Sequence, residues 1–499
     1  MRITPISLLL MSLPAAAAAL SPNLPAGRDA TFSQGRGELQ SRLKQEPDKR
    51  EAQNLILMVG DGNGVNSVTA TRIFAGQAHG MSGEEYQLSY EKMPHLALVK
   101  TYNTDAQVPD SAGTITAMLT GYKTRAGVIS VDARLERGDC NEVEQHRLTS
   151  LFDLAREHDW ARGVVTTTRV THATPAGAFA ISADRNFESD TRMPGNCAGQ
   201  KDIAAQLADA RLDFVAGGGS SQFVSGTDPA TGVRGERQDS RNLLQEARDA
   251  GVEVVVEPAA FKKLALDGRA PVLGLLNASH MSFEADRKLE PSLAEMTRSA
   301  IRHLDATGKR WILLVEAGRI DHAHHATNPR RALQDGIAFA DAVVAAQQTA
   351  GTDTLIIVTA DHSHTLTIQG YPRRGSPITG LCEKIGDTKG EPCLDAKGVP
   401  YPTLSYANGL RTPTSGTRTA PDPAKINSDD FLVEALIPQP FETHGGADVA
   451  AYAQGPGSWL VSGTMEQQTL YHIMGHATGL TSPRSALPPG GAAGKPANP

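Results

Sequence analysis

Hydrophobic and polar positions divide the chain into short apolar runs and longer segments with helical spacing. The apolar runs are NLILMVGDG (54–62), WILLVEAG (311–318) and DTLIIVTADH (353–362). The helical patterns between them are LTSLFDLAREH (148–158), PSLAEMTRSAIRHLDATG (291–308) and NPRRALQDGIAFADAVVAAQQTAG (328–351). Continuous runs of Val, Ile and Leu are typical of strands that are buried on both faces of a parallel sheet. Because such strands alternate with helices, the pattern predicts an α/β fold.

An acidic residue stands at the end of each apolar run, namely Asp61, Glu316 and Asp361. In α/β sheets, ligands bind at the edge where the carboxyl ends of the strands meet. Three carboxylates at this edge repel one another unless a cation lies among them. The pattern therefore indicates a metal site.

Histidines accompany these carboxylates. Asp321 and His325 are spaced i and i+4 in EAGRIDHAHHATNP, which places both on one face of a helical turn. The other histidines near acidic or glycine-rich positions are His322, His324, His362, His364 and His444. A lone histidine is more often a satisfied polar residue than a ligand. Together, however, imidazoles and carboxylates without thiolates favour zinc, with a mainly oxygen-ligated magnesium ion nearby.

The segment VPDSAGTITAMLTG (108–121) places Asp110 and Ser111 before a run without helix breakers, so both fit a helix N-cap. If Ser111 is only a cap, it has no chemical function. If it is a nucleophile, a zinc ion could activate it, because zinc lowers the pKa of a bound hydroxyl group. A serine, two metals and a helix N-terminus describe a phosphoryl-transfer site. Arg185 in ISADRNF is the candidate phosphate-binding arginine, and a surface salt bridge is its alternative role.

Seven motifs resemble those of alkaline phosphatases and occur in order across most of the chain. They are MVGDGNG (58–64), VPDSAGTITAMLTG (108–121), VVTTTRVTHATPAG (164–177), ADRN (183–186), VEAGRIDHAHH (315–325), TADHSH (359–364) and ETHGG (442–446). The wording THATP, GRIDHAHH and ETHGGADV is closer to the animal branch of this family than to the enteric bacterial branch. The resemblance implies a large central, mostly parallel sheet flanked by helices, a homodimer and hydrolysis of phosphate monoesters.

The resemblance also implies roles for individual residues. Ser111 would form a phosphoserine intermediate, and Arg185, steadied by Asp110, would bind the phosphate. We expect two zinc ions and one magnesium ion per chain. The expected ligands are Asp61, Asp361 and His362 for one zinc ion, Asp321, His325 and His444 for the other, and Asp61, Thr174 and Glu316 for magnesium. The first zinc ion would activate the serine. The second would stabilise the leaving oxygen and then provide hydroxide.

Two positions near these ligands depart from the enteric bacterial pattern. His172 replaces an acidic residue near the magnesium ion, and His322 replaces a lysine that reaches the phosphate through water. Both substitutions also occur in the animal branch. We therefore expect activation by added magnesium and a strongly alkaline optimum. Animal members carry a calcium site as well, but Asn277 stands where an acidic ligand is expected, although Glu290 is present. Calcium is therefore not predicted.

The overall composition is typical of a globular protein, and the N-terminal segment predicts export. The chain has 499 residues, of which 40% are hydrophobic and 21% charged, and its formal charge of −7 gives no sign of a nucleic-acid-binding surface. Residues 1–19 have the basic start, short apolar core and alanine-rich end of a signal peptide. We expect a periplasmic or extracellular protein without a membrane anchor.

Four cysteines fit two disulfides in an oxidising compartment. Three pairings are possible. Proximity in the sequence favours Cys382–Cys393, which leaves Cys140–Cys197.

The expected division of the chain has five parts. They are a signal peptide (1–19), an N-terminal arm (20–53), a catalytic α/β domain (54–369 and 431–481), an insertion rich in Pro and Gly (370–430) and a disordered tail (482–499). The insertion is expected to be a lid or a dimer contact.

Two other functions compete with a phosphomonoesterase. A related metal hydrolase, a phosphodiesterase or sulfatase, would use the same two-metal sheet, but such relatives usually have Thr or a modified Cys or Ser as the nucleophile. An exported zinc- or phosphate-binding protein would keep the metal ligands but would not need Ser111. Hydrolysis of a monoester, a diester and a sulfate ester separates these alternatives.

Overall fold

The computed structural model describes residues 30–197, 199–386, 390–413 and 418–482. The expected signal peptide (1–19), and the expected tail except for Ser482, lie outside these residues. The chain forms two compact units, Met1–Glu46 and Pro47–Pro499. In the first unit the described residues form helix α1 (Ala30–Arg42), which has no buried residue.

The second unit is built on a ten-stranded sheet with the order β15-β2-β14-β8-β1-β7-β3-β4-β6-β5. Its strands are β1 (Asn54–Gly60), β2 (His95–Lys100), β3 (Ala161–Arg169), β4 (Phe214–Gly218), β5 (Glu253–Val255), β6 (Val272–Leu275), β7 (Trp311–Ala317), β8 (Thr354–Ala360), β14 (Val449–Gln454) and β15 (Gly463–Glu466). The strands from β8 to β5 are parallel, whereas β14 is antiparallel to both of its neighbours. The predicted α/β class with a mostly parallel sheet is confirmed.

The three predicted strands lie side by side in the centre of the sheet. β1 pairs with β7 on one side and with β8 on the other, and Gly60 is in register with Ala317 and Ala360. Asp61 and Asp361 therefore leave the sheet at the same level, and Glu316 lies two positions before this level on its own strand. This register brings the three carboxylates to one edge of the sheet.

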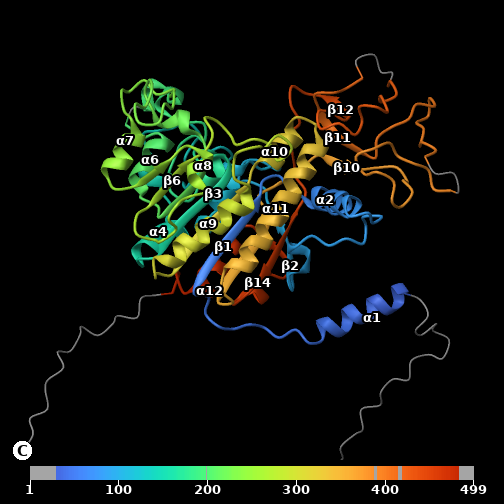
Figure 1. Ribbon diagram of the computed structural model, residues 1–499, viewed down its shortest axis with the longest axis horizontal. Helices are drawn as coiled ribbons and strands as arrows, with labels where there is room; N and C mark the ends of the chain where they lie inside the picture. The colour runs from blue at the N-terminus through green and yellow to red at the C-terminus, as the bar shows by residue number, and fades with distance from the viewer. Residues whose placement is uncertain (1–29, 198, 387–389, 414–417, 483–499) are drawn as a thin grey trace, which may run out of the picture. The chain divides into compact units, whose positions relative to one another are not determined.

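Helices cover both faces of this sheet. The helices of the second unit are α2 (Val65–Ala78), α3 (Ser111–Thr120), α4 (Leu151–Glu157), α5 (Ala173–Ala176), α6 (Ile203–Ala210), α7 (Leu243–Asp249), α8 (Pro258–Phe261), α9 (Leu293–Ala306), α10 (Arg319–His325), α11 (Pro329–Thr349) and α12 (Thr469–Thr478). Leu55 and Leu57 of β1 belong to a core that includes residues of α3, α4 and α12. Ile56 and Met58 belong to a second core with residues of α9 and α11, which lie side by side across the sheet in Figure 1.

The predicted helices at 148–158, 291–308 and 328–351 correspond to α4, α9 and α11. Each begins later than its hydrophobic pattern, because a side chain caps it. Ser150 and Ser292 form capping boxes, and Asn328 accepts a hydrogen bond from the backbone N–H of Arg331. The caps satisfy N–H groups that have no partner within the helix.

A small three-stranded sheet accompanies the large one. It has the order β10-β11-β12, with β10 (Leu366–Ile368), β11 (Leu404–Gly409) and β12 (Ala435–Pro438). Its core residues pack with Ala70 and Ile73 of α2 and with Leu333 of α11, and Figure 1 shows it beside these helices. A further pair of short strands, β9 (Ser363–His364) and β13 (His444–Gly445), joins two of the histidine motifs.

Both expected disulfides are present. Cys140 is bonded to Cys197, and Cys382 to Cys393. Two disulfides indicate an oxidising compartment. Within the described parts of the chain, no helix is long and apolar enough to cross a membrane.

Candidate active site

Ser111 is the first residue of helix α3, and Asp110 is its cap. The carboxylate of Asp110 accepts hydrogen bonds from the backbone N–H groups of Ala112 (3.3 Å) and Gly113 (3.1 Å). The hydroxyl of Ser111 is therefore not needed to cap the helix. The Ser111 side chain is buried, and its Oγ lies 3.2 Å from Nε2 of His362. The helix N-terminus, with its partial positive charge, thus meets the edge of the sheet.

The first cluster consists of Asp61, Asp361 and His362, all without solvent exposure. Nε2 of His362 lies 3.3 Å from Oδ1 of Asp61 and 3.3 Å from Oδ2 of Asp361. Oδ1 of Asp361 accepts the backbone N–H groups of Gly62 and His362, each at 2.9 Å. In contrast, neither oxygen of Asp61 nor Oδ2 of Asp361 has a hydrogen-bond donor among the described residues.

These distances match those between the ligands of a metal ion. Ligands at roughly 2.0–2.2 Å from a tetrahedral zinc ion lie about 3.3 Å from one another. Gly62 supports this arrangement, because it adopts a φ of +67° and a Cβ at this position would clash with the ring of His364. Buried carboxylate oxygens without donors are costly unless a cation binds them. The first cluster therefore fits zinc.

The second cluster consists of Asp321 and His325, which lie on α10, and His444, which lies on β13. Oδ1 of Asp321 lies 3.2 Å from Nε2 of His325 and 3.3 Å from Nε2 of His444. The two Nε2 atoms are 3.2 Å apart. The i, i+4 spacing predicted for Asp321 and His325 thus brings both side chains to one point, as expected.

The other ring nitrogen of each histidine in these two clusters faces a backbone carbonyl. Nδ1 of His325 donates to the carbonyl of Glu442 (2.5 Å), and Nδ1 of His444 donates to that of Pro109 (2.8 Å). Nδ1 of His362 lies 3.3 Å from the carbonyl of Ser363. Because a carbonyl can only accept, Nδ1 carries the proton, and Nε2 of the neutral ring has a lone pair. Two neutral rings would therefore place lone pairs 3.2 Å apart, an arrangement that a cation between them, a metal ion or a proton, stabilises. This is the ligand orientation found at zinc sites.

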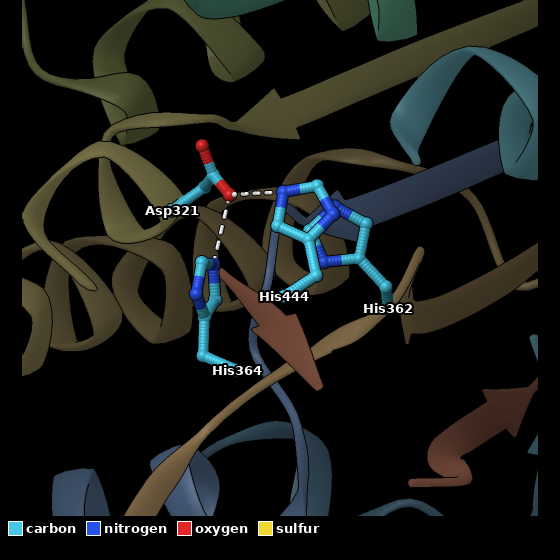
Figure 2. Close-up of side chains that lie close together, drawn as sticks. All are labelled: Asp321, His362, His364 and His444. Atoms are coloured by element: carbon cyan, nitrogen blue, oxygen red, sulfur yellow. Dashed lines mark hydrogen bonds and ion pairs between the residues drawn. The ribbon is translucent and has the colours of Figure 1, made fainter. Parts of the chain in front are cut away.

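Figure 2 shows how the two clusters adjoin. The rings of His362 and His444 are stacked with centroids 3.6 Å apart. His444 and His364 both point toward the carboxylate of Asp321. The two clusters are therefore neighbours, because His362 of the first cluster packs directly on His444 of the second.

His364 differs from the other histidines in its partners. Its Nε2 lies 2.8 Å from Oδ1 of Asp321, and its Nδ1 lies 2.5 Å from Oε2 of Glu442. Burial alone would lower the pKa of His364, but the two carboxylates raise it to about 10. Because each ring nitrogen of His364 lies against a carboxylate oxygen, His364 holds Asp321 and Glu442 in place. The sequence motif TADHSH includes His364 without revealing this role, and Glu442 was not predicted at all, although it belongs to the motif ETHGG.

A third cluster, rich in oxygen atoms, includes Asp61, Thr174 and Glu316. Oε2 of Glu316 accepts hydrogen bonds from the hydroxyls of Thr166 and Thr168, whereas Oε1 has no partner among the described residues. The hydroxyl of Thr174 is also buried and without a partner among them. Buried oxygens that lack donors fit the hard cation Mg²⁺. Asp61 belongs to this cluster and to the first one.

Arg185 lies between Asp110 and His172. Its Nη1 donates to Oδ2 of Asp110 (3.0 Å), and its Nη2 lies 3.3 Å from Nε2 of His172. Burial would raise the pKa of Asp110, but Arg185 and the backbone N–H of Gly113 hold it below its usual value. Asp110 is therefore an anion that orients the guanidinium of Arg185 beside the N-terminus of α3.

Of the two positions that depart from the enteric pattern, His172 lies next to this arginine, and His322 lies next to His172. The rings of His172 and His322 have centroids 5.6 Å apart, and Nδ1 of His322 lies 2.8 Å from Nη1 of Arg319. His172 also lies with Asp61 and Glu316 in the third cluster. At the expected position of an acidic calcium ligand, Asn277 donates to Oε1 of Glu290 (2.7 Å).

The metal-free site concentrates negative charge. Burial and neighbouring carboxylates raise the pKa of Asp61 well above its usual value, and they raise that of Asp361. Burial raises the pKa of Glu316 to about 7, against the hydrogen bonds from Thr166 and Thr168. Without metals the folded protein therefore holds protons that the unfolded chain releases near its ordinary pKa.

A pH-dependent loss of stability follows for the metal-free protein. Raised folded-state pKa values mean that the folded state binds more protons, so stability falls as pH rises. For His364, whose folded pKa is about 10, this loss extends from about pH 6.5 to pH 10. Histidines with lowered pKa values oppose the loss only below about pH 6.5. We expect chelator-treated protein to unfold about 5 °C lower at pH 9.5 than at pH 7.

Protein with bound metals is expected to behave differently. Its ligands must be deprotonated, so the stabilisation by metals grows as pH rises. Differential scanning calorimetry with and without chelator at both pH values measures the two trends. Equal unfolding temperatures of the metal-free protein at pH 7 and 9.5 would contradict the raised pKa values of His364 and of the buried carboxyl groups.

Comparison with known proteins agrees with this geometry. A family profile described as "Alkaline phosphatase" matches residues 52–480. The chain is 40% identical over 455 residues to the tissue-nonspecific isozyme of alkaline phosphatase from Gallus gallus, and the match covers 87% of this chain and 86% of that protein. It is 39% identical over 448 residues to alkaline phosphatase from Gadus morhua, covering 86% of this chain and 92% of that protein.

Solved structures include the same fold. Alkaline phosphatase from Thermus thermophilus superposes with a TM-score of 0.64 at 25% identity, covering 89% of this chain and 95% of that one. The profile, the relatives and the fold agree with the resemblance of the seven motifs and with the animal-like wording of three of them. The chain therefore belongs to the alkaline phosphatase family.

Proposed function

We propose that this chain, a phosphomonoester hydrolase by family, acts through a phosphoserine intermediate on Ser111 with two zinc ions and one magnesium ion. One observation supports this most directly. His325, His362 and His444 each direct Nδ1 at a backbone carbonyl and Nε2 at a cluster of buried ligand atoms. The first zinc ion would be held by Asp61, Asp361 and His362, the second by Asp321, His325 and His444, and magnesium by Asp61, Thr174 and Glu316.

The bound metals would lower the pKa of hydroxyl groups beside them and stabilise negative charge on oxygen. Ser111 Oγ then attacks the phosphorus, the bond from phosphorus to the alcohol oxygen breaks, and the alcohol leaves with a proton. In the second step water attacks the phosphoserine, the bond from Oγ to phosphorus breaks, and inorganic phosphate is released. Both steps keep the phosphate at the N-terminus of α3, which favours an anion.

Arg185 positions the phosphate in both steps. Its guanidinium can direct two N–H groups at phosphate oxygens, and Asp110 fixes its plane through the 3.0 Å bond at Nη1. Asp110 also caps α3, so one carboxylate aligns the arginine with the helix that carries Ser111. His172 lies beside Arg185 and the third cluster, and His322 lies beside His172; both would tune binding of magnesium.

We propose that residues 1–19 direct export, that the protein acts in a periplasm or outside the cell, and that it forms a homodimer. Its two disulfides support an oxidising location. We also propose that residues 370–430 form an insertion into the catalytic domain (54–369 and 431–481), and their core residues pack against α2 and α11 of that domain.

Hydrolysis of three esters tests this function. We expect p-nitrophenyl phosphate to be hydrolysed with activity that rises from pH 7 to 10 and with added magnesium. Bis(p-nitrophenyl) phosphate and p-nitrophenyl sulfate should react far more slowly. Elemental analysis of the same sample should give two zinc ions and about one magnesium ion per chain.

Other outcomes assign other functions. A preference for the diester or the sulfate would move the chain to the related hydrolases with the same sheet. Metals without turnover of any ester would indicate a binding protein. Neither metals nor turnover would contradict the assignment of the clusters themselves.

A further inference from the structure

His324 is a buried histidine next to the second cluster that belongs to none of the three clusters. It lies on α10 between Asp321 and His325, and it has no solvent exposure. Its Nε2 lies 2.9 Å from the hydroxyl of Ser67, and its Nδ1 lies 2.7 Å from the hydroxyl of Tyr406. Because both ring nitrogens are occupied, His324 cannot bind a metal ion in this arrangement.

The two partners of His324 come from different parts of the fold. Ser67 lies on α2, and Tyr406 lies on β11 of the small sheet, both with no more than 2% exposure. His324 therefore connects the ligand-bearing helix α10 to the layer of helices on one side and to the small sheet on the other.

Helix α10 depends on such contacts for its position. It has seven residues, and a helix of this length is not stable by itself. Just beyond it, the carbonyl of Thr327 accepts the backbone N–H of Val433 (3.0 Å). The carbonyl of His325 accepts the backbone N–H of Glu442 (2.9 Å). These bonds hold the backbone at its C-terminal end. Two buried side chains oppose rotation of the helix, namely Ile320 in the second core and His324 through its two hydrogen bonds.

The ring of His324 also contacts the group that orients Asp321. Its centroid lies 4.8 Å from that of His364, whose Nε2 lies 2.8 Å from Oδ1 of Asp321. A rotation of His324 would therefore displace both the helix and the hydrogen-bonding partner of a candidate metal ligand. A shift of a fraction of an ångström matters at a site that needs ligand distances within about 0.2 Å.

We propose that Ser67 and Tyr406 are positioning residues for the second zinc ion, acting through His324 on Asp321 and His325. The inference rests on the proposed function, because it assigns a purpose to contacts around the proposed ligands. The small sheet thereby contributes to the catalytic centre through one hydroxyl group. Partners beyond the direct ligands of a metal typically change its affinity by about 10- to 100-fold.

The rate of zinc release to a chelator tests this proposal independently of enzyme activity. Tyr406→Phe removes the hydroxyl but keeps the ring that packs with Leu404 and Phe431 in the core of the small sheet. We expect one of two zinc ions per chain to pass to a colorimetric chelator about 10- to 100-fold faster than in the wild type. The value of kcat should fall and recover when excess Zn²⁺ is added, whereas a purely structural defect would not be reversed in this way.

Two further variants complete the design. Ser67→Ala should give the same faster release, and the double variant should add little to the larger single effect, because both hydroxyls act through one ring. Tyr401→Phe is the matched control, since Tyr401 lies in the same region with its ring near Arg418 and not near His324. It should release zinc as the wild type does.

The outcomes separate this proposal from the proposed function. Wild-type rates of zinc release in both Tyr406→Phe and Ser67→Ala would overturn the positioning role while leaving the phosphatase assignment intact. If circular dichroism shows that Tyr406→Phe is unfolded, Ser67→Ala alone decides. A wild-type protein that binds no zinc would overturn both proposals. Zinc in a wild type without ester turnover would overturn only the proposed function, and the release rates would still decide this one.

Discussion

Replacing Ser111 with alanine is expected to reduce kcat/KM for p-nitrophenyl phosphate by about 10⁴-fold or more while leaving the metal content unchanged. The physical reason lies in the separation of roles at the start of α3. Asp110 caps the helix, and the clusters at the sheet edge hold their ligand atoms without the serine. The Ser111→Ala variant would therefore keep the fold and the metal ligands but lose the atom that accepts the phosphoryl group.

Covalent labelling makes this expectation more specific. Wild-type protein mixed with radiolabelled phosphate and quenched in acid should retain about one phosphoryl group per chain, whereas Ser111→Ala should retain none. Zinc and magnesium contents of the two proteins should agree. A variant that keeps a tenth of the activity would show that another group accepts the phosphoryl group.

Ser150→Ala is a matched control that should lower stability without changing activity. Ser150 is similarly buried and caps α4, where its hydroxyl accepts the N–H of Asp153 in a capping box. Loss of such a cap costs about 1 kcal/mol of stability. We expect a lower unfolding temperature and unchanged kcat/KM, so that the loss of a buried serine is distinguished from the loss of the nucleophile.

The sequence predicts the centre of the fold well because its strands are buried on both faces. β1, β7 and β8 are continuous apolar runs, and such runs leave few alternatives to a central parallel strand. Strands near the edge carry a weaker signal. β2 alternates exposed Leu96 and Leu98 with buried Ala97 and Val99, which six residues cannot distinguish from a loop by pattern alone.

In the site, too, the sequence predicts the features that depend on local spacing but not the contacts between distant segments. The strand-end acids and the i, i+4 pair of Asp321 and His325 follow from local spacing, so the sequence predicts them. Both Asp110 and Ser111 are preferred capping residues, so the sequence leaves the choice open, and the structure assigns the cap to Asp110. His364 and Glu442 meet across 78 positions in the sequence, so only the folded chain reveals their pairing.

Asp61→Asn is expected to have the second large effect, because Asp61 belongs to both the first and the third cluster. An amide is nearly the same size as the carboxylate but carries no charge for the metals. We expect the variant to lose one zinc ion and the magnesium ion, and kcat/KM to fall by about 10³- to 10⁴-fold. Elemental analysis and p-nitrophenyl phosphate hydrolysis at pH 9 measure the two losses.

Asp61→Asn should stabilise the metal-free protein and destabilise the protein with bound metals. In metal-free protein, Asp61 is a buried carboxyl whose pKa is raised by burial and by Asp361, so its carboxyl group makes the fold less stable as pH rises above the ordinary pKa of an aspartate. Removing the charge should therefore raise the unfolding temperature of the chelator-treated variant above that of chelator-treated wild type. With excess metals the variant should unfold at a lower temperature than the wild type, because it lacks the stabilisation that metal binding at two sites provides.

Asp335→Asn is the control for this change of sign. It removes a buried carboxyl group that is not a metal ligand, so it shows the effect of removing a buried charge alone. Asp335 is also buried, and burial raises its pKa to about 7, but it lies on α11 and belongs to none of the metal clusters among the described residues. Its replacement should raise the unfolding temperature at pH 9 by the same amount with and without metals. If Asp61→Asn also stabilised the metal-loaded protein, the carboxylate would not be a shared ligand, and the joint arrangement of the first and third clusters would be wrong.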